Sequence, residues 1–169
     1  NAAVISVPGS ATDASGIAQV ELSTDSGTTW TIATGTTAWS YSWSPAADGT
    51  YTLKTRAKDG SGNIETPSAG VMVVVDRSLP SSTLGAPAAG STLTGSTHII
   101  SGTSSDGTGT GVALVEVSVS NGASWNAANG TNPWTFTWVA PADGTYTLRS
   151  RARDRAGNVE LPASGSAVN

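Results

Sequence analysis

The residues of this sequence that could do chemistry are acids and amides placed in turns. Asp59 and Asn63 bracket the stretch Asp-Gly-Ser-Gly-Asn, and Asp154 and Asn158 bracket a matching Asp-Arg-Ala-Gly-Asn. Carboxylate and amide oxygens in turns are the hard ligands that Ca²⁺ takes. The same pattern also closes a hairpin, because the Gly before the Asn supplies a positive φ. Both interpretations stay open at this stage.

Residues for nucleophilic or zinc chemistry are scarce. The chain has one histidine, His98, and no cysteine. Hydrolysis needs paired carboxylates or a nucleophile with a positioned base, and zinc sites are built largely from His and Cys. Asp48 and Asp143 stand beside Gly in turns, where Asp is expected to bond the local backbone. The sequence therefore predicts a protein that is not an enzyme.

Composition excludes two classes of partner. The net charge is −4 and charged residues make up 12% of the 169, without a run of Lys or Arg. A mildly acidic surface repels phosphate backbones, so we expect no nucleic-acid partner. No apolar stretch is long enough to span a bilayer, so we expect no membrane insertion.

The chain begins at Asn1 without Met or a signal peptide, which indicates a segment taken from a longer protein.

The chain contains one sequence twice. Residues 16–43 recur as 111–138 and residues 48–67 recur as 143–162, both at an offset of 95. Looking for such a period comes first, because it defines the domain count. At this fixed offset Asp13 aligns with Thr108 and Asp106 with Ala11, so the loops that carry these acids are expected to differ.

Period-2 alternation, turn signals and the absence of helical periodicity predict an all-β chain. Tyr51 and Tyr146 follow Asp-Gly-Thr, where immunoglobulin-like folds place a tyrosine corner. We therefore expect two tandem immunoglobulin-like (Greek-key) β-sandwich domains. The first covers residues 1–76 and lacks its first strand. The second covers residues 77–169, and its last strand is truncated.

This fold would bring the acids together. The loops before the third and the last strands of such a sandwich lie at the pole where the incoming chain arrives, so turn-borne acids gather there. We expect a possible calcium site in each domain, with no other cofactor. The candidate ligands are Asp76, Asp106, Asp154 and Asn158 in the second domain, and Asp13, Asp59 and Asn63 in the first.

Two surface interpretations compete with structural ones. Indole rings such as Trp39 and Trp43 stack on sugars, which favours an accessory carbohydrate-binding module, or they fill the core. The basic row with Arg149, Arg151 and Arg153 either binds anionic glycans or is a solvated strand face paired with acids such as Glu116. If Trp39 and Trp43 are exposed, a carbohydrate-binding module is favoured; if they are buried, a structural repeat is favoured.

The pattern V-E-x-S-x-D-x-G-x-x-W, followed by W-x-Y-x-W and by D-G-T-Y-T-L-x-x-R-A-x-D-x-x-G-N, resembles the bacterial Ig-like repeats of large secreted adhesins and surface fibre proteins. It covers almost the whole chain, twice. The resemblance implies a non-enzymatic extracellular or cell-surface rod, stalk or filament whose partners are neighbouring repeats or identical subunits. Asp-x-x-Gly-Asn is similar to calcium-bearing loops at adhesin repeat junctions. Val20 to Ser23 with Arg56 to Asp59 also resembles the Ig-like dimerisation domain of molybdenum sulfite oxidases.

The incomplete ends suggest how such repeats would join. An open sheet edge templates pairing with another strand. Strands of neighbouring subunits could therefore complete each sandwich, and glycans remain a possible surface partner.

Overall fold

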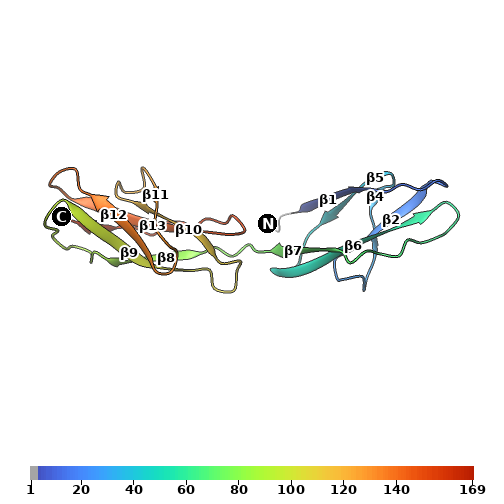
Figure 1. Cartoon of the computed structure of the whole chain (residues 1–169), viewed down its shortest axis with the longest axis horizontal. Helices are drawn as coiled ribbons and strands as arrows, with labels where there is room; N and C mark the ends of the chain where they lie inside the picture. The colour runs from blue at the N-terminus through green and yellow to red at the C-terminus, as the bar shows by residue number, and fades with distance from the viewer. Residues whose placement is uncertain (1–3) are drawn as a thin grey trace. The chain divides into compact units, whose positions relative to one another are not determined.

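A computed structural model describes residues 4–169, which form two compact units that divide between Val75 and Asp76. The described part of each unit consists of β-strands and connecting turns (Figure 1), as the alternation predicted. Asp76, which the sequence placed at the end of the first repeat, belongs to the second domain. Among the described residues, no helix has the length and apolarity needed to cross a membrane.

The first domain packs a sheet of three strands against a sheet of four. Val20, Leu22, Ala33 and Trp39 form its buried core. The smaller sheet has the order β1 (Ile5–Ser10), β5 (Ala38–Trp43) and β4 (Thr34–Gly35). The larger sheet has the order β3 (Thr31–Ile32), β2 (Ile17–Ser23), β6 (Gly49–Asp59) and β7 (Val71–Val75).

The second domain also has sheets of three and four strands, but its smaller sheet has an added edge strand, β8 (Ser81–Ala86), while the position of β4 is only an isolated bridge between Asn129 and Thr135. Its smaller sheet has the order β12 (Trp134–Val139), β9 (Thr97–Ser105) and β8. Its larger sheet has the order β11 (Asn126–Ala127), β10 (Val112–Ser118), β13 (Tyr146–Asp154) and β14 (Ser166–Val168). Within residues 4–75, no strand corresponds to β8, so the outer edge of β1 has no strand beside it.

Strand register corrects the alignment of the two copies. In the first domain Gly9 pairs with Trp39, and in the second Gly102 pairs with Trp134. The offset of the first common strand is therefore 93 rather than 95, so the second domain has two extra residues in the following loop. Asp13 corresponds to Asp106, and the alignment of Asp13 with Thr108 was wrong. A fixed offset cannot detect an insertion inside a loop rich in Gly, Ser and Thr.

The aromatic residues build the core as a shared strand face. Trp39 and Trp43 on β5 are 8% and 5% exposed, and Trp134 and Trp138 on β12 are 0% and 6% exposed. The hydroxyl of Tyr51 donates to the Ala47 carbonyl at 2.8 Å, the upstream backbone bond that defines a tyrosine corner. Tyr146 makes the same bond to Ala142. The predicted tyrosine corner is present in both domains.

One arginine in the basic row of each larger sheet is paired with an acid. In the second domain, Arg151 Nε donates to Glu116 Oε2 at 2.7 Å, and its guanidinium lies 4.3 Å from the ring centre of Trp125. In the first domain, Arg56 is held in the same way by Glu21 and Trp30. Each half-buried indole is thus covered on one face by an arginine, an arrangement that fixes strand register.

The turn after β2 is closed by Asp25. Its carboxylate accepts bonds from the Thr28 and Thr29 backbone and from the Thr29 hydroxyl, the last at 2.6 Å. These bonds, led by that hydroxyl, lower the pKa of Asp25 from 3.8 to about 2. In the second domain Ser120 takes this place and accepts from Ser124 N at 3.0 Å.

The Asp25 turn predicts an acid-dependent loss of stability. Because the pKa of Asp25 is lower in the folded than in the unfolded chain, its contribution is complete above about pH 4 and is lost as the pH falls towards 2. Asp25→Asn is expected to destabilise the first domain at pH 7 and to have a diminishing effect towards pH 2. Urea unfolding across this pH range measures the difference. The matched Ser120→Asn variant should show no such pH dependence; a parallel trend would contradict the assignment.

Candidate metal site

Three carboxylates meet at one pole of the second domain. Asp106 follows β9, Asp154 ends β13, and Asp76 is the first residue of the domain. One oxygen from each lies within 4.8 Å of the others. Asp106 and Asp154 are 8% and 2% exposed, and Asp76 is partly buried. Burying several like charges together is costly, and a bound cation offsets that cost.

Asp76 is fixed by the loop between β9 and β10. Its Oδ2 accepts from the Thr110 backbone N–H at 2.6 Å and from the Thr110 hydroxyl at 2.7 Å. Its Oδ1 accepts from Ser78 N at 3.0 Å. The side chain of the residue that opens the domain is thereby held against the pole, and its carboxylate joins the other two.

Asp106 carries the observation that points to a ligand. Its Oδ2 accepts from Gly111 N at 2.7 Å. Its Oδ1 is buried and has no hydrogen-bond partner among the described residues. A buried, unpaired carboxylate oxygen is unfavourable by itself, so an atom that coordinates it would stabilise the site.

Asp154 is oriented by Asn158, the other end of the Asp-x-x-Gly-Asn segment. Asn158 donates from its backbone to Asp154 Oδ1 at 2.8 Å and from Nδ2 to Oδ2 at 2.7 Å. Nδ2 also donates to the Asp76 carbonyl at 3.1 Å. The amide therefore ties two of the acids together as a positioning residue.

Gly109 lies directly over the cluster. A Cβ added there would stand 2.4 Å from Asp106 Oδ2 and 2.8 Å from Asp76 Oδ2. The chain passes so close to the carboxylates that only a residue without a side chain fits. Gly109 and Thr110 were missed in the sequence because a Gly in a Gly-Thr loop carries no signal until the facing groups are known.

Gly109→Ala is expected to destabilise the second domain by about 1–3 kcal/mol, because the methyl group must displace a buried carboxylate. Denaturant midpoints measure the stability. Gly85→Ala is the control, since the nearest atom to its Cβ would lie at an ordinary 3.6 Å. Equal effects of the two substitutions would show that the close approach at Gly109 is unimportant.

The first domain holds the corresponding residues, and among its described residues, 4–75, none is a counterpart of Asp76. Asp13 accepts from Ser15 N at 2.7 Å. Asp59 accepts from Ser61 N and Asn63 N and from the Asn63 side chain, which closes the hairpin with Gly62 at φ +96°. The hydrogen bond from the Asn63 side chain is the main cause that lowers the pKa of Asp59. Asp13, Asp59 and Asn63 line one groove.

Comparison with known proteins places the chain in a family. A family model described as a bacterial Ig domain matches residues 1–54 and 80–149. Among solved structures, the fibronectin(III)-like modules of Clostridium thermocellum CbhA are similar at 20% identity, with a TM-score of 0.62. That match covers 99% of this chain and 85% of the other, and it supports the fold alone. A comparison with curated proteins gave no match. With two sandwich domains and this match over most of its length, the chain belongs to the bacterial Ig domain family.

Proposed function

We propose that this chain is a non-enzymatic, extracellular structural repeat in which Ca²⁺ anchors the start of the second domain. The observation that carries the proposal is the buried cluster of Asp76, Asp106 and Asp154 with an unpaired Asp106 oxygen. Carboxylates of this kind are what Ca²⁺ takes, in flexible geometries of six to eight oxygens. Asn158 and Thr110 would hold the ligands in place.

The position of Asp76 gives the cation a mechanical role. β7 ends at Val75, and the next residue is Asp76. A cation bound to Asp76 would remove conformational freedom from the segment that opens the second domain, because its first residue could no longer leave the pole. A repeat joined in this way would be stiffer with Ca²⁺ than without it, which suits a rod or stalk.

An extracellular location agrees with this role. Bacterial Ig-like domains are typically extracellular or on the cell surface. Extracellular modules bind Ca²⁺ with a Kd of about 10⁻⁴–10⁻³ M, an affinity that a site of three carboxylates can reach. The expected partners are further repeats on the same or a neighbouring chain.

Carbohydrate binding finds less support. Trp39, Trp43, Trp134 and Trp138 are buried. The two half-buried indoles, Trp30 and Trp125, have an arginine over one face. Stacking on a sugar needs a free, exposed ring face.

Calorimetric unfolding in CaCl₂ and in EDTA tests the proposal. We expect Ca²⁺ to raise the transition of the second domain and to leave that of the first unchanged, since no counterpart of Asp76 stands among residues 4–75. Equal concentrations of MgCl₂ should have a smaller effect, because Mg²⁺ demands octahedral geometry and dehydrates reluctantly. An unfolding profile indifferent to both cations would contradict the proposal.

A further inference from the structure

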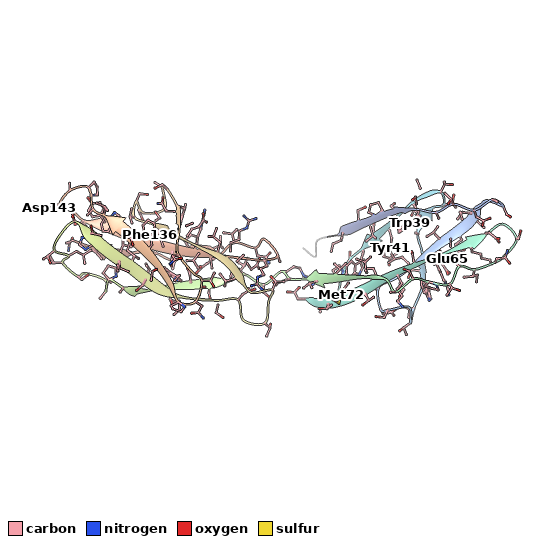
Figure 2. The ribbon with its side chains drawn as sticks, in the orientation of Figure 1. Trp39, Tyr41, Glu65, Met72, Phe136 and Asp143 are labelled. Atoms are coloured by element: carbon pink, nitrogen blue, oxygen red, sulfur yellow. The ribbon has the colours of Figure 1, made fainter. Side chains whose placement is uncertain are left out.

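A groove of about 540 Å³ runs along the first domain. Its wall includes Ala11, Trp39, Thr55 and Glu65, from β5, β6 and the segments after β1 and β6. Figure 2 labels Trp39 and Glu65 in this domain. The groove adjoins β1, whose outer edge has no strand beside it among the described residues.

The second domain shows what fits in the same place. There β8 pairs with β9 and contacts β13, and Pro80, just before it, is fully buried. Ser82 Oγ lies 2.6 Å from Glu160 Oε2 and 2.8 Å from Ser150 Oγ. Leu84 packs against the buried core.

The residues that receive β8 have counterparts in the groove. Glu160 corresponds to Glu65, and both accept a backbone N–H of the larger sheet, at 2.8 and 2.9 Å. Ser150 corresponds to Thr55. Trp134, which is fully buried, corresponds to Trp39, which is 8% exposed and lines the groove. The first domain therefore has the acceptor surface and lacks, within its described residues, the strand that covers it.

Register defines how a strand would pair there. β8 aligns Ser82, Thr83 and Leu84 with Ser104, Thr103 and Gly102. At the offset of 93, these partners correspond to Ala11, Ser10 and Gly9. The next position is Pro8, which has no N–H. It corresponds to Ser101, where the β8–β9 register shifts, and a bulge is a place where a sheet tolerates proline.

We infer that the groove of the first domain binds an extended segment with the sequence pattern of residues 76–86, attached ahead of the domain as β8 is attached ahead of β9. The segment supplies a buried Pro, a Ser that bonds Glu65, and a Leu that packs beside Trp39. Its leading Asp reaches Asp13 and Asp59 and completes a second cation site. This last step rests on the proposed calcium function, whereas strand binding does not.

A peptide of residues 76–87, labelled with fluorescein, tests the groove on the whole chain in EDTA. We expect saturable one-to-one binding by fluorescence anisotropy. Thr55→Arg, which fills the groove, should weaken binding at least tenfold, and so should Leu84→Asp in the peptide. Ser42→Arg, on an exposed position of β5, is the matched control that should bind normally. Absence of saturable binding at millimolar peptide would count against the groove.

A fusion variant tests whether the segment binds the groove when it is attached ahead of the first domain. Residues 76–96 are fused directly to Val4, because Thr97 corresponds to Val4 at the offset of 93. We expect the first domain to unfold at a higher temperature in EDTA, and the grafted chain to bind about twice as much Ca²⁺ as the parent. Stabilisation without extra Ca²⁺ would support the strand and refute the second cation site. An unchanged first transition would overturn the inference.

Discussion

Asp106→Asn is expected to raise the melting temperature of the second domain in EDTA and to lower it, relative to the parent chain, in CaCl₂. Without a cation, the substitution removes one of three buried carboxylates whose oxygens lie within 4.8 Å, which relieves repulsion. With Ca²⁺, it removes a charged ligand. Because Asn has nearly the shape of Asp, the sign of the change reports the cation rather than the packing.

The size of the calcium effect follows from mass action. A cation at a hundred times its Kd stabilises the folded state by about 2.7 kcal/mol. For a domain of this size that corresponds to roughly 10–20 °C in Tm. Most of this gain should vanish in Asp106→Asn, and calorimetric titration should show the matching loss of affinity.

Asp13→Asn is the matched control for Asp106→Asn. It changes the equivalent position of the first domain, where the described residues offer no third acid. Asp13→Asn should change the melting temperature of the first domain only slightly, and by the same amount in CaCl₂ and in EDTA. If Asp106→Asn stabilises the chain equally in both solutions, the cluster does not bind Ca²⁺.

Trp134→Ala is expected to cost the second domain about 3–5 kcal/mol of unfolding free energy, as fully buried tryptophans do. Its ring lies against Gly102, where a Cβ would stand 2.5 Å away, and Nε1 donates to the Thr103 carbonyl at 3.1 Å. The variant loses packing and leaves that carbonyl without this bond. A sugar-binding tryptophan would instead cost little stability when removed.

Trp39→Ala in the first domain is the comparison. Its ring is equivalent but borders the open groove, so the surrounding chain can relax and water can enter. We expect a smaller loss than for Trp134→Ala, measured by denaturant unfolding of each variant. Equal losses would show that the open edge of β1, as the described residues leave it, does not weaken the packing around Trp39.

The sequence by itself determined the fold and the tandem organisation, because these depend on local patterns. Alternation on β5 placed Trp39 and Trp43 on one face, and the Asp-Gly-Thr turn placed Tyr51 near the start of β6. Strand pairing between β2 and β6 followed from the fold and left Glu21 facing Lys54 or Arg56, of which the structure selects Arg56. Each of these needs only a period, a turn and a partner strand.

The tertiary structure alone decided which acids meet. Asp76 and Asp154 are far apart in the sequence, and their approach depends on how the opening segment and the loop with Gly109 lie over the pole. The sequence named Asn158 as a candidate ligand, and the structure shows its amide nitrogen donating to the Asp154 carboxylate and to the backbone carbonyl of Asp76. The insertion that hid the match of Asp13 with Asp106, and the groove beside β1, became visible only through register and packing. The path of a loop and the neighbours of an edge strand depend on residues far apart in the sequence, so a local sequence pattern does not predict them.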